Sequence, residues 1–347
     1  MIPVQNVYYM LAYVFQVLNA QGYREVATES FDNAIELCSA ILTKGVSVQL
    51  KRGLGREYIE RKGAFSAVRG KINLSESIKE QSMLNKQMIC SFDDFSENNY
   101  MNRIIKTTMA LLLRSDLSKK RKKSLRKLLV YFGNVESLDP HRINWRLQFN
   151  RCNATYRMLI AICNLIIKGL IQTTASGRTK LMDFFDEAHM YHLYEKFILE
   201  YYKKEFPDLH ASASQIPWQL DDNEDAMLPM MQSDIMLSHR GNILIIDAKY
   251  YAHTTQQHFN KRTIHSGNLY QIFTYVKNKE AEMTDQKHKV SGMLLYAKTD
   301  EVIQPNHVYH MSGNKISVRT LDLNQDFSII RKQLNDIVFE HFPKLAK

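Results

Sequence analysis

Cysteine is scarce in this 347-residue sequence, and proline and glycine are few. The four cysteines stand singly, without the spacing of metal ligands or redox motifs, so we expect reduced thiols in the core of a cytoplasmic protein. Seven prolines and 13 glycines, with no repeat or low-complexity stretch, are typical of a globular chain. Disulfide-stapled and disordered classes are thereby excluded.

Long apolar segments are lacking as well. The longest apolar run covers residues 158–171 and contains Asn164 and Lys168, whereas a membrane span needs roughly twenty apolar residues. The first residues include no basic region and no small-residue cleavage site, so no signal peptide is expected. We predict a cytoplasmic protein without a membrane partner.

Positive charge, by contrast, is in excess and unevenly distributed. Lys and Arg number 46 against 36 Asp and Glu, which leaves a net charge of +10. Residues 1–150 hold 23 basic and 14 acidic side chains, whereas residues 151–347 hold 23 and 22. A charge of this sign favours a polyanionic partner, nucleic acid before an acidic membrane surface.

The length and the hydrophobic patterns predict two α/β domains, divided within the polar stretch 173–180. The N-terminal domain, residues 1–178, should be α+β, with a small β-rich unit near residues 46–74 where glycines break short alternating segments. Its helices are expected at residues 4–18, 31–42, 102–113, 124–131 and 156–171. The C-terminal domain, residues 179–347, should have a mixed central sheet flanked by helices. Its expected elements are a helix at 190–205, a hairpin of 231–237 with 243–251, a helix at 268–277, strands at 292–297 and 316–320, and a helix at 327–342.

The informative motif is Asp234, then twelve residues, then Asp247-Ala248-Lys249. Alternation along a strand puts Asp247 and Lys249 on one face, and hairpin pairing can bring Asp234 to the same face. Two carboxylates after an apolar strand are costly unless they are paired or bind a cation, and carboxylate oxygens suit Mg²⁺. A lysine beside the metal can position or deprotonate the attacking water.

An alternative reading of this motif is a surface strand pair with an Asp–Lys salt bridge. Three observations favour a site. The strand at 243–246 is apolar on both faces, which indicates a buried central strand. Glu195 lies on the preceding amphipathic helix, where a third acid can reach the metal. Gln271 and Tyr275 are four apart on the following helix and share one face.

These residues resemble the PD-(D/E)xK nuclease superfamily, and nearly the whole chain resembles the McrC family, the nuclease subunits of modification-dependent McrBC restriction systems. The segments that carry the resemblance are IPVQNVYYML (2–11), NRIIK (102–106), IIDAKYY (245–251) and SGNLYQ (266–271). The resemblance implies a restriction-endonuclease-like fold for the C-terminal domain. One departure is that the first acid follows Ser233, and the nearest proline is Pro229.

The resemblance also implies roles for individual residues. Mg²⁺ or Mn²⁺ would be held by Asp234, Asp247, the backbone carbonyl of Ala248 and the helical acid Glu195, although Glu195 also fits a solvated helix charge. Lys249 would be the catalytic lysine. Gln271 and Tyr275 would orient the lysine or contact DNA, and a packing role is the alternative.

The partners implied are double-stranded DNA with methylated cytosine and an McrB-like GTPase ring, which the chain would stimulate. The sequence has no G-x-x-x-x-G-K-[ST] phosphate loop, so GTP would enter only through the partner subunit. Arg52, Arg56 and Arg69 fall where the family places its partner-contacting region. Basic turns on a small β-barrel are the alternative for these arginines.

The strongest basic run holds seven Lys and Arg residues in positions 119–127. A phosphate contact would make DNA binding salt-dependent, whereas a solvated helix face is the alternative. The candidate DNA-contacting residues of this run are Lys119, Lys120, Arg121, Lys122 and Lys123.

The leading hypothesis is therefore a Mg²⁺-dependent DNA endonuclease subunit that acts within a GTPase complex. One alternative is a GTPase-activating adaptor with a weak or degenerate nuclease fold, and another is a stand-alone DNA repair nuclease.

Overall fold

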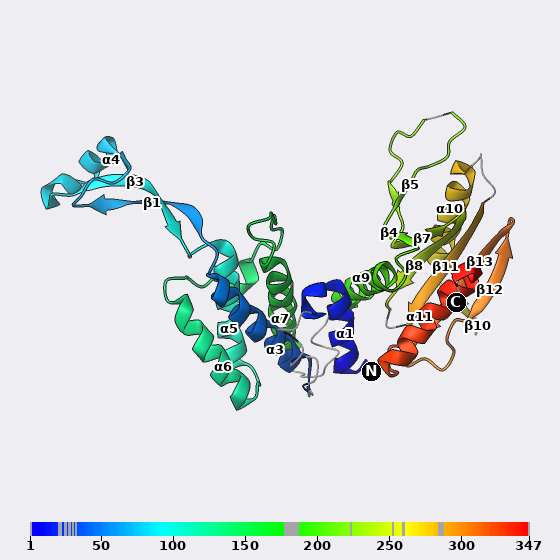
Figure 1. Cartoon of the computed structure of the whole chain (residues 1–347). Coiled ribbons are helices and arrows are strands. Elements are labelled where there is room, and N and C mark those ends of the chain that lie inside the picture. Colours follow the sequence, from blue (N-terminus) through cyan, green and yellow to red (C-terminus); the bar gives the residue numbers. More distant parts are fainter. Residues whose placement is uncertain are drawn as a thin grey trace. The chain divides into compact units, whose positions relative to one another are not determined.

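The computed structural model describes residues 2–19, 23, 26, 29, 31, 33–176, 187–222, 224–251, 253–258, 261–283 and 288–345. The chain forms two compact units, a sheet unit of residues 1–31 with 185–347 and a helical unit of residues 32–184 (Figure 1). The structure thus corrects the assignment of residues 1–31 to the N-terminal domain. The predicted boundary between 178 and 179 lies outside the described residues.

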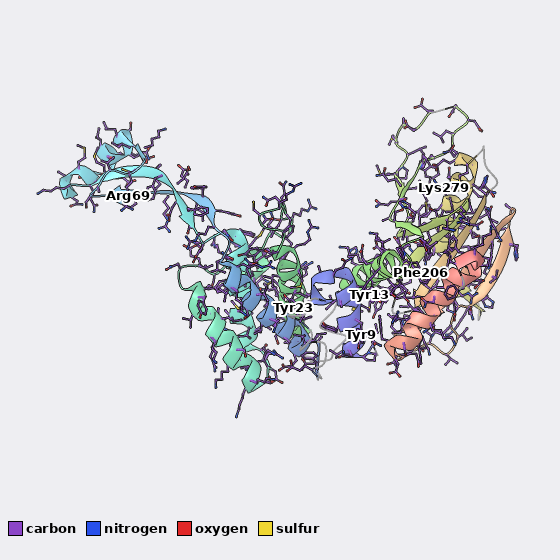
Figure 2. All side chains as sticks on the ribbon, viewed as in Figure 1. Tyr9, Tyr13, Tyr23, Arg69, Phe206 and Lys279 are labelled. Atoms are coloured by element: carbon purple, nitrogen blue, oxygen red, sulfur yellow. The ribbon has the colours of Figure 1, made fainter. Side chains whose placement is uncertain are left out.

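The first helix, α1 (Val4–Val14), belongs to the sheet unit because its aromatic side chains pack there. The Tyr9 ring stacks on Phe327 at 4.5 Å between centroids, and the Tyr13 hydroxyl donates a hydrogen bond of 2.8 Å to Glu205. Figure 2 labels Tyr9 and Tyr13 on α1. Asn6 donates to the carbonyls of Leu323 and Gln325, both at 2.8 Å. These contacts join residues more than 190 positions apart in the chain.

The sheet unit is built on one six-stranded mixed sheet with the order β12-β13-β11-β8-β7-β4. β8, β11 and β13 are parallel, whereas β4, β7 and β12 pair antiparallel with their neighbours. The strands are β4 (His210–Ser212), β7 (Ile235–His239), β8 (Asn242–Lys249), β11 (Lys289–Ala297), β12 (His307–Met311) and β13 (Asn314–Leu321). The predicted β7–β8 hairpin is confirmed, and β8 is a buried central strand.

Helices and short ribbons complete this unit. Ile272, Tyr275 and Val276 of α10 pack on one face of the sheet, against Ile243 and Ile245 among others. The helices are α9 (Glu187–Glu205), α10 (Ser266–Glu282), α11 (Phe327–His341) and the turn η6 (Pro343–Leu345), with η1 (Gln16–Asn19) after α1. The ribbons pair β5 (Gln215–Ile216) with β6 (Met231–Gln232) and β9 (Thr255–His258) with β10 (Lys261–Ile264).

In the helical unit, α3 and α5 pack against α7, and both contact α6. Its helices are α3 (Ala34–Arg52), α4 (Leu74–Lys79), α5 (Tyr100–Arg114), α6 (Lys119–Leu129) and α7 (Tyr156–Ser176), with the turns η3 (Ser82–Asn85), η4 (Val130–Phe132) and η5 (Pro140–Arg142). The helix expected to end before Gly45 continues to Arg52. Buried Ile41, Leu42 and Val46 extend its apolar stripe at helical spacing through Gly45.

The β-rich part of this unit lies later than predicted. It is the three-stranded sheet β1-β3-β2, formed by β1 (Glu57–Phe65), β2 (Lys71–Ile72) and β3 (Met88–Ser96). The structure therefore corrects the range 46–74, because residues 46–52 are helical and β3 comes from farther along the chain. We call residues 56–97 the arm, since β1 and β3 extend away from α3 and α5 (Figure 1).

A buried hydrogen-bonded joint holds the base of the arm. The Tyr156 hydroxyl accepts from the Gly55 N–H (2.7 Å) and donates to Asn102 Oδ1 (2.8 Å). The Asn102 amide in turn donates to the carbonyls of Gly55 (2.9 Å) and Glu97 (2.8 Å), and Asn99 also donates to Gly55. Both strands of the arm are therefore tied to α5 and α7 where they begin and end.

The structure also bears on the expectations for the cysteines and for membrane-spanning segments. Cys38, Cys90 and Cys163 are buried free thiols, as expected, but Cys152 is exposed, so its assignment to the core was wrong. Within the described parts of the chain, no helix is long and apolar enough to span a membrane.

Candidate active site

The β7–β8 hairpin brings the two predicted acids together. Asp234 comes directly before β7, whose ladder with β8 begins at the pair Ile235–Ile246. Beyond that pair, the Asp234 carboxylate takes the place of a strand partner, since its Oδ2 accepts the N–H of Ala248 at 2.8 Å. Asp234 is thereby fixed beside Asp247.

Lys249 lies against the second acid. Its Nζ is 2.8 Å from Asp247 Oδ2, and the two side chains are only 7% and 2% exposed. Nζ also donates to Gln271 Oε1 at 3.3 Å, and Gln271 Nε2 donates to the Tyr275 hydroxyl at 2.9 Å. Tyr275 is buried in the core beneath α10. The structure thus favours the packing alternative for Tyr275 over the predicted DNA contact, because its hydroxyl holds Gln271, which in turn holds the lysine.

Burial makes the carboxylates costly to ionise. It raises the pKa of Asp247 to about 7, where Lys249 opposes the shift and Asp234 adds to it. Burial also raises the pKa of Asp234, against the lowering effect of the Ala248 N–H and Lys249. Although burial disfavours its ammonium form, the Asp247 carboxylate raises the pKa of Lys249. Burial therefore favours the neutral form of both carboxyl groups, and the single lysine offsets this effect only in part.

Helix α9 adds a third acid and a tyrosine. Burial raises the pKa of the half-buried Glu195, and the negative charge of Asp234 raises it further. Four residues earlier, the pKa of Tyr191 is raised by burial and then by Asp234, Asp247 and Glu195. Glu195 also lies 3.8 Å from the ring Nδ1 of the exposed His192. Tyr191 is not among the residues predicted from the sequence, although it lies four positions before Glu195 and so on the same face of α9.

A further set of residues missed from sequence joins the strand ends to α10. Tyr296 stands opposite Lys249 in the β8–β11 ladder, and its hydroxyl accepts from Asn268 Nδ2 at 2.9 Å. The Tyr251 hydroxyl donates to Asn268 Oδ1 at 3.3 Å. Asn268 belongs to the SGNLYQ segment, so that segment ties α10 to both strands as well as carrying Gln271.

The donor set fits a hard divalent cation. Asp247 Oδ2 is buried, and among the described residues it lacks a hydrogen bond of good geometry despite its ion pair with Lys249. Carboxylate oxygens of this kind suit Mg²⁺, which keeps several waters. Asp234 and Asp247 are the residues that would hold it. Among the residues described, no group of three or more His, Cys, Asp or Glu side chains is gathered closely enough for a metal site, so Glu195 and the Ala248 carbonyl stay predictions.

The three predicted partner-binding arginines lie at or on the arm. Arg52 is exposed at the end of α3, and Arg56 forms an ion pair of 2.7 Å with Glu97. The Arg69 guanidinium lies 5.9 Å from the centre of the Phe92 ring, on the arm (Figure 2). The arm also exposes large apolar side chains, namely Tyr58, Val68, Ile72, Leu74, Ile78, Met83, Leu84 and Phe95.

The predicted DNA-contacting run forms α6, and its five candidates differ in position. Lys119, Lys120 and Lys123 are exposed. Arg121, however, is only 11% exposed and lies 3.6 Å from Glu36 of α3. The structure therefore removes Arg121 from the exposed set, because it faces a neighbouring helix, and leaves the lysines, with Lys122 partly covered, as candidates.

Most of the chain matches a known protein family. A sequence model of the family described as "McrBC 5-methylcytosine restriction system component" matches residues 4–297. The chain belongs to this family. The resemblance to McrC is thereby confirmed at the family level, and the match to the McrBC family includes Asp234, Asp247, Lys249 and Gln271.

The individual proteins to which this McrBC-family chain is similar are also McrBC proteins. It is 27% identical to the type IV methyl-directed restriction enzyme EcoKMcrBC of Escherichia coli (strain K12), over 98% of each chain. A half-complex from a tetradecameric assembly of Thermococcus gammatolerans McrB AAA+ hexamers with bound McrC is similar at 17% identity, with a TM-score of 0.49 over 96% of this chain and 76% of that one. The Thermococcus gammatolerans McrBC complex is similar at 19% identity, with a TM-score of 0.40 over 58% of each chain.

Proposed function

We propose that the chain is the nuclease subunit of a restriction complex and cleaves phosphodiester bonds of DNA that carries methylated cytosine, with Mg²⁺ or Mn²⁺ as cofactor. The observation that carries the proposal is the buried cluster of Asp234, Asp247 and Lys249 at the end of the central strand. Membership of the McrBC family supports it, since the relative from Escherichia coli is a methyl-directed restriction enzyme.

The residues of the chain supply most of what this reaction needs. Asp234 and Asp247 would hold the cation, which would stabilise negative charge on the phosphate and lower the pKa of a bound water. Lys249 would orient the attacking water, because Gln271 and Asp247 fix its ammonium group within the site. Tyr191 and Glu195 would border the site from α9.

For the partner, we propose an McrB-like GTPase ring that binds and hydrolyses GTP. The similar half-complex from Thermococcus gammatolerans contains McrB AAA+ hexamers with bound McrC. The arm supports a protein partner, because a large apolar surface on a globular chain marks a docking site. Tyr58 and Phe95, whose ring centres are 5.0 Å apart, are 74% and 53% exposed on it.

The test is cleavage of methylated DNA by the chain assembled with its GTPase partner. Asp247→Ala and Lys249→Ala should each abolish cleavage while leaving stimulation of the partner's GTPase unchanged, because both residues lie in the sheet unit and away from the arm in sequence. Asp208→Ala, at an exposed position of the same unit, is the matched control and should cleave normally. Cleavage that survives both site substitutions would contradict the proposal.

The same assay distinguishes the alternatives. A GTPase-activating adaptor would stimulate the GTPase fully and yet bind Mg²⁺ weakly and cut no DNA. A stand-alone repair nuclease would cut DNA without GTP or a partner. The buried, complete Asp–Asp–Lys set argues against a degenerate site.

A further inference from the structure

Glu301 is a carboxylate outside the site that holds the segment following Lys249. Glu301 lies in the connection between β11 and β12, and its Oε2 accepts three hydrogen bonds. Two come from Thr254, from the N–H at 2.6 Å and the hydroxyl at 2.7 Å, and one from the Thr299 hydroxyl at 3.2 Å. Thr254 is fully buried, so the removal of this carboxylate would leave buried donors unpaired.

The contact between Glu301 and Thr254 lies at the same end of the sheet as the acids. β8 and β11 are parallel and both end here, with Lys249 opposite Tyr296. Thr254 follows Lys249 by five residues, and Glu301 follows the end of β11 by four. Ligands of mixed and parallel sheets bind at the carboxyl ends of the strands. Glu301 therefore fixes the course of the chain between Lys249 and α10, the helix that carries Gln271.

The same carboxylate faces an arginine. Arg262 of β10 places its Nη1 3.6 Å from Glu301 Oε1, and the two side chains are 42% and 13% exposed. At this distance the pair is an ion pair without a hydrogen bond, so the contact leaves the guanidinium donors available for another acceptor. Arg262 lies two positions before Ile264 on β10, so the two side chains share one face of that strand, where Ile264 packs against the core and Arg262 is exposed.

DNA is negatively charged, so its binding at this end of the sheet needs positively charged side chains. The sheet unit itself is slightly acidic, since residues 1–31 and 185–347 together hold 19 basic and 23 acidic side chains. In the site itself, one lysine faces the acids Asp234 and Asp247, and Glu195 of α9 adds a further negative charge that acts on Asp234. A guanidinium binds a backbone phosphate with two donors and a fixed geometry.

We propose that Arg262 binds a phosphate of the DNA backbone beside the acid pair, and that Glu301 is a positioning residue that holds Arg262 and the segment after Lys249 in place. This inference rests on the proposed nuclease function. Cleavage kinetics of the assembled complex test it, on methylated DNA over a range of salt concentrations.

Arg262→Gln should raise the KM for DNA roughly five- to tenfold at 0.1 M salt and leave kcat within about twofold, since one phosphate then lacks its guanidinium partner. It should also make the slope of log(kcat/KM) against log[salt] shallower by about 0.9. Arg240→Gln is the matched control, because Arg240 is exposed at the opposite end of β8, and it should behave as the wild type. A wild-type KM and salt slope for Arg262→Gln, even with a lowered melting temperature, would overturn the phosphate contact.

Glu301→Ala should raise KM at least as much as Arg262→Gln, and the double substitution should be no worse than the more defective single one. Glu301→Gln keeps acceptors for Thr254 and should restore most of the affinity, which a general loss of folding would not allow. If Glu301→Gln is as defective as Glu301→Ala, the positioning role is wrong. Cleavage by Asp247→Ala would contradict the proposed nuclease function. If Asp247→Ala is inactive but Arg262→Gln behaves as the wild type, only the role of Arg262 is contradicted.

Discussion

Asp247 carries a carboxyl group that is 2% exposed, and its burial raises the pKa from 3.8 to about 7. Between these two values the folded chain keeps a proton that the unfolded chain has released. The stability that this proton contributes is therefore complete below the unfolded pKa and is lost as the pH rises through about 7. Burial raises the pKa of Asp234 and Glu195 as well, so their contributions have the same sign.

We therefore expect the stability of Asp247→Asn relative to the wild type to rise by roughly 2–3 kcal/mol between pH 5 and pH 8 in the absence of divalent cations. Chemical denaturation in a chelator at both pH values measures this. Addition of Mg²⁺ at pH 8 should stabilise the wild type and not the variant, since the cation needs the ionised carboxylate. A stability difference that is the same at pH 5 and pH 8 would contradict the assigned pKa.

Gln271 and Tyr275 act through Lys249. Gln271→Ala removes the acceptor 3.3 Å from the ammonium group, and we expect cleavage to fall roughly tenfold or more. Tyr275→Phe leaves Gln271 without its hydroxyl partner and should cause a smaller loss in the same direction. Tyr270→Phe on the same helix is the control, because Tyr270 is 68% exposed. Equal rates for Tyr275→Phe and Tyr270→Phe would show that the hydroxyl does not support the lysine.

At the scale of elements, the contact between β11 and α10 positions the site. A Cβ on Gly292 would lie 2.8 Å from Val276 Cγ2 and 2.9 Å from Ile272 Cγ1, both of which belong to α10. Gly292→Ala should therefore lower the free energy of unfolding by about 1–3 kcal/mol and reduce cleavage, because Ile272 follows Gln271 directly. Gly267→Ala is the matched control for stability, since no atom lies within 4 Å of its added Cβ. Urea denaturation and cleavage rates check both effects.

The joint at the base of the arm makes a second prediction for an element. Tyr156→Phe leaves the partly buried Gly55 N–H without its acceptor and the buried Asn102 Oδ1 without a donor, so it should cost about 1–3 kcal/mol. Hydrogen exchange should show faster exchange at the Gly55 amide. Tyr58→Phe, at an exposed ring on the arm, should change neither quantity. Unchanged exchange at Gly55 would mean that the joint does not restrain the arm.

The sequence predicted most long helices and the β7–β8 hairpin, because apolar periodicity reports burial directly. It failed where a pattern supports two periods, as in α3, whose residues 46–50 alternate and also continue a helical stripe. The short edge strand β4 is set by pairing with β7 farther along the chain, which local periodicity does not record. The edge strand β12 forms a tight hairpin with β13, with Met311 opposite Asn314, and the sequence prediction did not include it. In the site, Asp234, Asp247 and Lys249 followed from the hairpin, whereas Glu301 and Tyr296 are placed by the parallel β8–β11 pairing.

For the whole molecule, the arrangement of units follows from contacts between distant parts of the chain. Residues 1–31 belong with 185–347 because Asn6 binds the connection between β13 and α11, and Tyr13 binds Glu205 of α9. No local signal marks such a contact, since an amphipathic helix can pack in either domain. The charge follows the same division, because the basic excess falls on α5 and α6 of the helical unit rather than beside the acids.

The four lysines in the first half of α6, three of them exposed and Lys122 partly covered, lead to a prediction for DNA binding. Replacement of Lys119, Lys120, Lys122 and Lys123 by Gln should weaken DNA binding to methylated and unmethylated duplexes equally, because phosphate contacts read no sequence. The slope of log K against log[salt] should become shallower by up to about 3.6, which is about 0.9 for each lysine that binds a phosphate. Arg121 is left in place because its pairing with Glu36 supports the packing of α6 on α3. Fluorescence anisotropy of the full chain in an Asp247→Asn background measures binding without cleavage. An unchanged salt slope combined with weaker stimulation of the GTPase would instead assign this surface to the partner.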